Sequence, residues 1–296
     1  MTEGQVVVVG AGIMGRGIAY VTAVGGTAVH LVDVSDAVLA DARVAIDRDL
    51  DAGTARGKVT PESASAARDL LRTMTSLDAA CGGASLVIEA VIESVTVKHQ
   101  VIAAVERAAP ADAVLATNTS ALSVTELGAA LADPSRFLGM HFFNPVPKMA
   151  LCELVRSEAT SEATLERAEA AARRMGKVTV RVNDRPGFAT SRLNALLGNE
   201  GFRMLEEGVA TAEDIDTAAR LGLNHPMGPL EMADLVGLDV RLAVLEHLAA
   251  TLGDRFAPSP THRRLVAEGR LGRKTGHGVY RYGADGARLD EPSDLP

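Results

Sequence analysis

The chain has 296 residues with 47% hydrophobic content and a formal net charge of −8, so it reads as an ordinary globular protein. Its length is enough for one large or two medium domains, and its acidic balance argues against nucleic acid or an anionic membrane as partner. Two cysteines without a paired framework, no apolar run of membrane-spanning length and a strand pattern that begins at Gln5 predict a cytoplasmic protein without a signal peptide.

A glycine-rich loop follows the first predicted strand. Residues 5–9 (QVVVV) form a continuous β-branched run, which is typical of a buried parallel strand. A helix is predicted over residues 16–24 and a second strand over residues 28–32. Between the first strand and the helix lies a G-x-G-x-x-G pattern, Gly10-Ala11-Gly12-Ile13-Met14-Gly15. In such a loop the glycines allow a tight turn and close approach of a pyrophosphate, and the helix N-terminus supplies amides to the phosphates.

Asp33, at the end of the second strand, indicates which dinucleotide binds. A carboxylate there can accept hydrogen bonds from both ribose hydroxyls and would repel a 2′-phosphate, and no arginine follows in residues 34–36. An isolated glycine motif is a weak signal, but a strand, loop, helix, strand and acid in this order are a strong one. The pattern predicts NAD as cofactor, bound by Gly10, Gly12, Ile13, Met14, Gly15 and Asp33.

Residues 36–71 are predicted to be helical and highly charged, with a break at residues 53–61. Basic side chains in this segment could bind a phosphorylated group arching over the site, and Arg56 and Lys58 are the candidates. Acidic residues match or outnumber the basic ones, so a solvated helix face is the alternative interpretation.

Three more predicted strands each lead into polar residues. Residues 86–89 run into Ala90 and Glu93 and then into a helix with Lys98, residues 113–116 run into a polar turn that ends at Ser120, and residues 136–141 end at His141. Because the carboxyl ends of parallel strands meet where doubly wound sheets bind ligands, we expect these residues at one edge. The alternatives are a surface charge pair for Glu93 and Lys98 and a helix N-cap for Ser120.

The segment His141–Glu153 (HFFNPVPKMALCE) contains a histidine, two prolines that can stiffen a loop, and one carboxylate. We hypothesise an acid/base histidine held on a rigid turn, with Glu153 close enough to fix its tautomer. The alternative is a buried histidine satisfied by the backbone, with Glu153 at the solvated end of a strand.

The last third of the chain changes from strand to helix periodicity. A final strand is predicted over residues 177–182 and a hinge-like turn over residues 184–187. Helices are expected over residues 188–207, from a capping box at Thr211, after residues 226–229 and over residues 238–252. The predicted fold class is therefore α/β, a Rossmann-type, mostly parallel sheet over residues 1–184 followed by an all-helical C-terminal domain over residues 185–296.

Several motifs together resemble the L-3-hydroxyacyl-CoA dehydrogenase family, in particular the short bacterial 3-hydroxybutyryl-CoA dehydrogenases. They are TNTSAL, HFFNPVP with Glu153 twelve residues after His141, and DRPGF at residues 184–188, and the likeness runs from residue 5 to about Tyr282. The resemblance implies hydride transfer between NAD and C3 of a short-chain L-3-hydroxyacyl-CoA. It also implies a homodimer, formed by the helical domain, which closes over the substrate.

The resemblance assigns roles to individual residues. His141 would be the acid/base, Glu153 would orient it and Ser120 would bind the substrate oxygen. Asn144 would line the NAD site together with Ala90, Glu93 and Lys98, and Lys274 in the tail RKTGHG would reach the cofactor. Ser191 stands where the family has a substrate-binding asparagine, so acyl recognition is altered or the change is neutral. No metal site is expected.

Two other functions stay open. The same chemistry could act on an acyl group bound to a carrier protein or on a free hydroxy acid, because the mixed charge of residues 36–62 is a poor match for a CoA 3′-phosphate. The chain could also be a non-catalytic protein that retains NAD. The set of Ser120, His141 and Glu153 argues against that last function.

Overall fold

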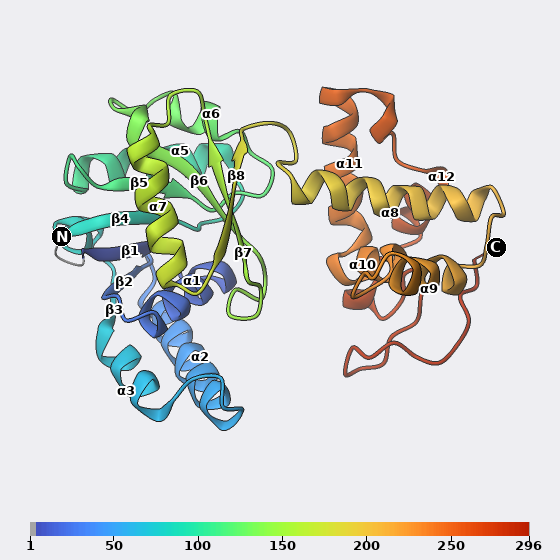
Figure 1. Ribbon diagram of the computed structural model, residues 1–296, viewed down its shortest axis with the longest axis horizontal. Helices are drawn as coiled ribbons and strands as arrows, with labels where there is room; N and C mark the ends of the chain where they lie inside the picture. Colours follow the sequence, from blue (N-terminus) through green and yellow to red (C-terminus); the bar gives the residue numbers. More distant parts are fainter. Residues whose placement is uncertain (1–3, 296) are drawn as a thin grey trace. The chain divides into compact units, whose positions relative to one another are not determined.

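An eight-stranded sheet forms the centre of the first half of the chain in the computed structural model, which describes residues 4–295 (Figure 1). The strand order is β3-β2-β1-β4-β5-β6-β7-β8. Neighbouring strands are parallel except β6 and β7, which are antiparallel. The strands are β1 (Gln5–Val9), β2 (Val29–Val32), β3 (Leu71–Met74), β4 (Ala84–Glu89), β5 (Val114–Thr117), β6 (Phe137–Phe142), β7 (Leu151–Arg156) and β8 (Val178–Asn183).

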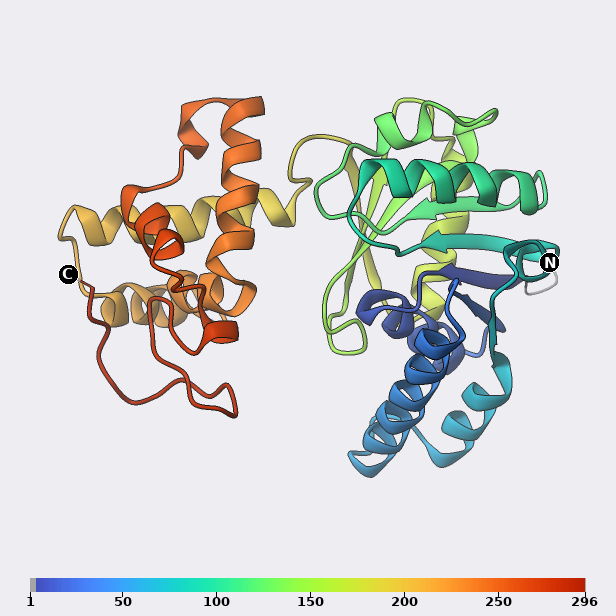
Figure 2. The same ribbon diagram turned by 180° about the vertical axis from the view of Figure 1, so that it is seen from behind.

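Helices connect these strands and cover both faces of the sheet: α7 lies in front of it in Figure 1 and α5 in the reverse view of Figure 2. Alternate residues of β1, Val6 and Val8, belong to a buried cluster with Ile18 of α1 and Leu165 of α7. Because helices cover both faces of the sheet, residues 6–9 of β1 can all be apolar, and they form a continuous apolar run. The helices are α1 (Ile13–Val24), α2 (Asp36–Ala55), α3 (Pro61–Leu70), α4 (Leu77–Cys81), α5 (Val95–Ala108), α6 (Val124–Gly128) and α7 (Glu162–Arg174).

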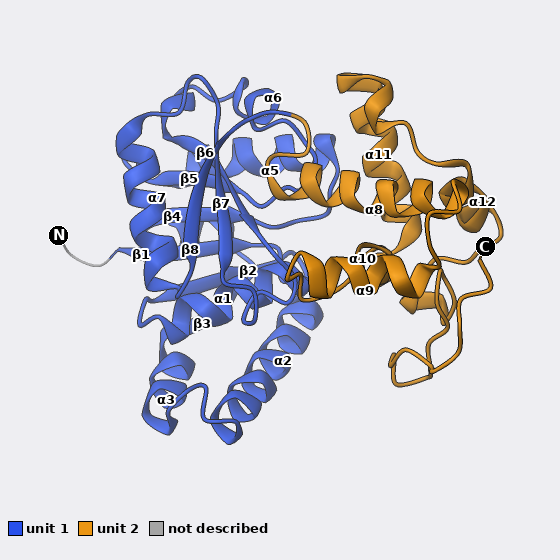
Figure 3. Cartoon of the chain, turned by 45° about the vertical axis from the view of Figure 1, so that its right-hand side comes forward, with its two compact units in different colours: residues 1–185 blue, residues 186–296 orange. Residues whose placement is uncertain are grey.

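The chain divides into two compact units between Arg185 and Pro186 (Figure 3). The second unit is built from α8 (Thr190–Glu206), α9 (Ala212–Gly222), α10 (Pro229–Val236), α11 (Leu238–Leu252) and α12 (Pro260–Ala267). Two buried carboxylates organise it. Asp216 accepts hydrogen bonds from the backbone at the start of α10, and Asp234 accepts them from the backbone of Val279 and Tyr280, so it anchors the C-terminal segment.

The predicted fold class is confirmed, and three local predictions are corrected. No rigid turn holds His141, which lies in β6 as the strand predicted over residues 136–141 indicated, and Glu153 lies within β7. Ser120 does not cap a helix, since the N-cap of α6 is Ser123. Strand β3 was missed because its LRTM sequence continues directly from α3 and has two exposed polar residues in the middle.

Neither a membrane-spanning helix nor a metal site is found in the part of the chain that the structure describes. No helix within residues 4–295 is both long enough and apolar enough to cross a membrane. Over the same residues, no three histidine, cysteine or acidic side chains gather in a way that could hold a metal ion.

Candidate active site

The loop between β1 and α1 is shaped for close approach of a ligand. Gly10 has φ of +103°, and a Cβ at this residue would lie 2.7 Å from the carbonyl oxygen of Ala90. A Cβ at Gly15 would lie only 1.7 Å from the Gly10 carbonyl oxygen, so the helix and the loop are in direct contact there. Gly12 differs, because nothing lies within 4 Å of its Cβ position. The open side of the loop is therefore at Gly12.

Gly12 is also the N-cap of α1, and no side chain caps this end of the helix. In contrast, α2, α3, α4, α6 and α7 each begin at a serine or threonine whose side chain accepts a backbone N–H. The first N–H groups of a helix have no partner within it, so an uncapped end can bind an anionic group. The first turn of α1 places Ile13, 61% exposed, and the half-buried Met14 beside this end.

Asp33 lies at the end of β2, next to the glycine loop. Its Oδ2 accepts a hydrogen bond from the Ala11 backbone at 2.9 Å, and its Oδ1 accepts one from the Ser35 backbone at 3.2 Å. Each carboxylate oxygen retains a second lone pair that can accept from a ribose hydroxyl. The next residue, Val34, is 97% exposed and offers no cation for a 2′-phosphate. These residues fit a dinucleotide with free ribose hydroxyls.

Lys98 is not at the surface but is fully buried beneath the edge of the sheet. Its Nζ donates to both carboxylate oxygens of Glu89, at 2.8 and 3.0 Å, and lies 3.4 Å from Glu93 Oε2. Glu89 also accepts hydrogen bonds from the Thr117 hydroxyl and the Val91 backbone, so its charge is fully compensated. The alternative of a surface charge pair is wrong, because no part of the Lys98 side chain is exposed. A role of Lys98 at the cofactor site stays a prediction.

Glu93 holds the loop that carries Ser120. Its Oε1 accepts from the Thr119 hydroxyl at 2.6 Å, from the Ser120 backbone at 3.0 Å and from the Ala121 backbone at 3.3 Å. The Ser120 side chain remains exposed above this loop. The structure therefore brings Glu93, Lys98 and Ser120 together, and Glu93 contacts both of the others. Sequence reasoning did not single out the buried Glu89, which pairs with Lys98.

His141 and Glu153 face each other across the antiparallel pair β6 and β7. They are register partners, and His141 Nδ1 lies 2.7 Å from Glu153 Oε2. His141 is 4% exposed and Glu153 is fully buried. An ionised carboxylate can only accept hydrogen bonds, so the imidazole proton belongs on Nδ1 and Nε2 is the acceptor nitrogen of the ring. The ring of Phe143 lies 4.4 Å from the imidazole and limits its rotation.

Two neighbours of this pair complete the local geometry. Asn118 Oδ1 accepts a hydrogen bond from the backbone of Phe142 at 2.9 Å, which ties the Ser120 loop to the strand that carries His141. Sequence reasoning missed Asn118, although its place directly after a strand was a usable signal. Burial raises the pKa of the Cys152 thiol to about 12, so this neighbour of Glu153 stays protonated.

The remaining predicted residues are distributed over both units. Asn144 is exposed in the connection after β6, and Arg56 and Lys58 are exposed at the turn between α2 and α3. Ser191 is half-buried in the first turn of α8, and Lys274 forms an ion pair with Asp239. Substrate or cofactor contacts of these residues stay predictions.

Comparison with known proteins agrees with this geometry. Residues 5–185 match the model of the 3-hydroxyacyl-CoA dehydrogenase NAD binding domain, and residues 187–282 match that of the 3-hydroxyacyl-CoA dehydrogenase C-terminal domain. A probable 3-hydroxybutyryl-CoA dehydrogenase of Bacillus subtilis is 40% identical over 279 residues, which cover 94% of this chain and 97% of the relative. A 3-hydroxybutyryl-CoA dehydrogenase of Mycobacterium tuberculosis is 41% identical over 281 residues, which cover 94% of this chain and 98% of that one.

A solved structure extends the likeness to three dimensions. The (S)-3-hydroxybutyryl-CoA dehydrogenase of Ralstonia eutropha has a TM-score of 0.91 and 40% identity, and the match covers 95% of this chain and all of that one. The match to the NAD binding domain includes the open glycine loop and Asp33, so NAD is the cofactor. The chain belongs to the 3-hydroxyacyl-CoA dehydrogenase family and is an NAD-dependent oxidoreductase.

Proposed function

We propose that this enzyme transfers a hydride between NAD and C3 of a short-chain L-3-hydroxyacyl-CoA, with His141 as acid/base and Glu153 as its orienting partner. The observation that carries the proposal is the 2.7 Å hydrogen bond between these two buried side chains on directly paired strands. The strand pairing gives both residues a rigid backbone, and a pre-organised pair is what proton transfer requires. The names of the relatives, 3-hydroxybutyryl-CoA dehydrogenases, support a short acyl chain.

The tautomer of His141 determines which ring nitrogen accepts the substrate proton. With Nδ1–H donating to Glu153, the lone pair of Nε2 accepts the proton of the C3 hydroxyl while C3 is oxidised. NAD, when bound, supplies the hydride acceptor. The buried Glu153 carboxylate stabilises the imidazolium that forms, and in the reverse direction His141 returns the proton to the oxygen at C3. Such general acid–base catalysis contributes ~10²–10⁴-fold.

Substrate positioning falls to the loop after β5. The exposed Ser120 hydroxyl donates to the substrate oxygen, and Glu93 holds the loop by accepting from the backbone of Ser120 and Ala121. Ser191 and Arg56 are further candidates for substrate contacts, as Asn144 and Lys274 are for the cofactor. The helical unit is assigned to the substrate and to the interface of a cytoplasmic homodimer, following the family resemblance.

The test is oxidation of NADH by the purified protein with acetoacetyl-CoA, run beside NADPH. We expect rapid loss of the NADH signal and a much slower reaction with NADPH, because Asp33 repels a 2′-phosphate. Turnover of a carrier-bound or free 3-oxo acid but not of the CoA thioester would transfer the same chemistry to that substrate. Binding of NADH without turnover of any of them would refute the proposal.

A further inference from the structure

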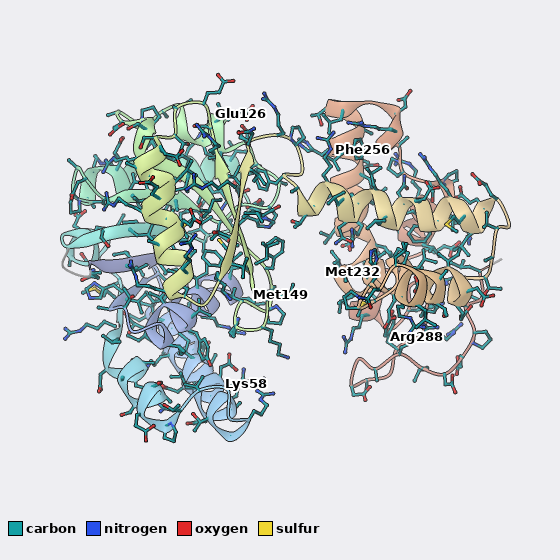
Figure 4. All side chains as sticks on the ribbon, in the orientation of Figure 1. Lys58, Glu126, Met149, Met232, Phe256 and Arg288 are labelled. Atoms are coloured by element: carbon teal, nitrogen blue, oxygen red, sulfur yellow. The ribbon has the colours of Figure 1, made fainter. Side chains whose placement is uncertain are left out.

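The buried face of α11 carries one charged residue among apolar ones. Its buried side chains are those of Leu238, Arg241, Leu245 and Leu248, spaced three or four residues apart on one side of the helix. Leu238 belongs to one hydrophobic cluster of the helical unit, and Leu245 belongs to a second one with Phe256, which Figure 4 labels. Arg241 therefore lies on the buried face between two apolar clusters, and only 5% of its surface is exposed.

One edge of the Arg241 guanidinium is buried without a partner. Its Nε and Nη2 are shielded from solvent and form no hydrogen bond with any residue that the structure describes. Burial lowers the pKa of Arg241 to about 10, and no carboxylate within residues 4–295 offsets this effect. By contrast, the largely buried Arg136 donates to the carbonyl oxygen of Pro110 and lies 3.8 Å from Glu106 Oε1. Arg241 is therefore a buried cation that the described part of the chain leaves uncompensated.

His262 of α12 adds a second unpartnered atom beside Arg241. Its side chain is 1% exposed, and its Nε2 lies 2.8 Å from the carbonyl oxygen of Leu238, one turn before Arg241 on α11. A carbonyl oxygen only accepts, so the ring proton is on Nε2, and Nδ1, which has no partner among the described residues, is an acceptor. Burial lowers the pKa of His262, and the charge of Arg241 lowers it further, so the imidazole is neutral.

A water molecule does not complete this arrangement by itself. It can accept hydrogen bonds from Nε and Nη2 of Arg241, but the charge of the guanidinium stays uncompensated, and an unpaired buried charge is strongly destabilising. The Nε–H and Nη2–H bonds point the same way from one edge of the planar group, which is the geometry that binds both oxygens of a carboxylate. With one cation, a neutral imidazole and a lone pair on Nδ1 that repels further negative charge, the surroundings match a single negative charge.

We propose that Arg241 binds a small monocarboxylate in the helical unit, whose two oxygens accept from Nε and Nη2. Because 5% of Arg241 stays exposed, its side chain lies just beneath the surface, and a ligand as small as acetate needs only side-chain movement to reach it. The ligand stabilises the first turn of α11, where Asp239 pairs with Lys274. This site is separate from the acid/base pair, since His141 and Glu153 belong to the first unit.

The experiment measures thermal unfolding of the intact protein in sodium acetate and in sodium chloride at equal ionic strength. We expect saturating acetate to raise the unfolding midpoint of the wild type by about 2–4 °C relative to chloride. The Arg241→Met variant should lose this shift. In chloride it should unfold at the same temperature as the wild type or higher, because an apolar side chain replaces an unpaired buried cation.

Two further variants test the geometry of the site. Arg241→Lys keeps the charge but cannot bind both oxygens from one edge, so its acetate shift should be smaller than that of the wild type. The matched control is Arg220→Met, which removes an exposed arginine from α9 of the same unit and should keep the full shift. Equal acetate shifts in the wild type and in Arg241→Met would overturn the site. A lower midpoint of Arg241→Met in both salts, with no acetate shift in the wild type, would also overturn it, because Arg241 would then have a structural role alone.

Anomalous diffraction from crystals soaked in sodium bromide locates an anion directly. We expect a bromide peak beside Nε and Nη2 of Arg241 in the wild type, no such peak in Arg241→Met, and loss of the wild-type peak when acetate is added. A bromide ion that acetate does not displace would overturn the assignment to a carboxylate and leave an inorganic anion in its place. An empty edge in both bromide and acetate would overturn the inference.

Discussion

Replacing Glu153 by glutamine removes a charge from the active site while it leaves the shape of the side chain almost unchanged. The amide oxygen can still accept the Nδ1–H of His141, so the tautomer and the 2.7 Å contact can persist. What is lost is the attraction between a carboxylate and the imidazolium that forms during proton transfer. For charges about 4 Å apart at an effective dielectric constant of about 20, this attraction is about 4 kcal/mol.

Each 1.36 kcal/mol changes a rate about tenfold, so the full loss would lower kcat by about 10³-fold. Because the amide dipole retains part of the stabilisation, we expect Glu153→Gln to lower kcat by about 10²–10³-fold. The affinity for NADH should stay within about threefold, since Glu153 lies on β7 and the dinucleotide loop follows β1.

The assay is steady-state oxidation of NADH with acetoacetyl-CoA, alongside fluorescence titration of NADH. Glu158→Gln, a substitution of an exposed glutamate just after the same strand, is the control for loss of one negative charge. If Glu153→Gln keeps more than a fifth of the wild-type kcat, the charge of Glu153 has no part in catalysis and the proposed mechanism is wrong.

Three further predictions follow from the packing. The Gly12→Ala variant should fold normally, since nothing lies within 4 Å of the added Cβ, but it should bind NADH at least tenfold more weakly in a fluorescence titration. The Gly15→Ala variant should impair folding itself, because its Cβ would lie 1.7 Å from the Gly10 carbonyl oxygen. Lys98→Met should destabilise the first unit by about 3–5 kcal/mol in urea unfolding, because it leaves the Glu89 carboxylate buried and unpaired; a loss below 1 kcal/mol would contradict this. Burial raises the pKa of Asp234 to about 6, so the folded state binds its proton more tightly than the unfolded state does. Stability should fall by up to about 3 kcal/mol as pH rises from about 4 to 6, and Asp234→Asn should flatten that dependence.

Local sequence patterns were sufficient to predict the fold class and the cofactor loop. The glycines at residues 10–15, the run of β-branched residues before them and Asp33 after the next strand are close in sequence, so a single supersecondary unit brings them together. Fold class depends on such periodicity and on the order of elements. The change from strand to helix patterns near residue 184 indicated the second unit in the same way.

Only the tertiary structure decided which distant residues meet. The register that pairs His141 with Glu153 depends on an antiparallel contact between β6 and β7, and a shift by one residue would turn either side chain to the opposite face. The sequence placed Lys98 at the ligand-binding edge of the sheet or in a surface charge pair with Glu93, and only the structure shows that it is buried against Glu89 of β4. Electrostatic environment depends on distance in space, which single-residue propensities and local periodicity do not specify.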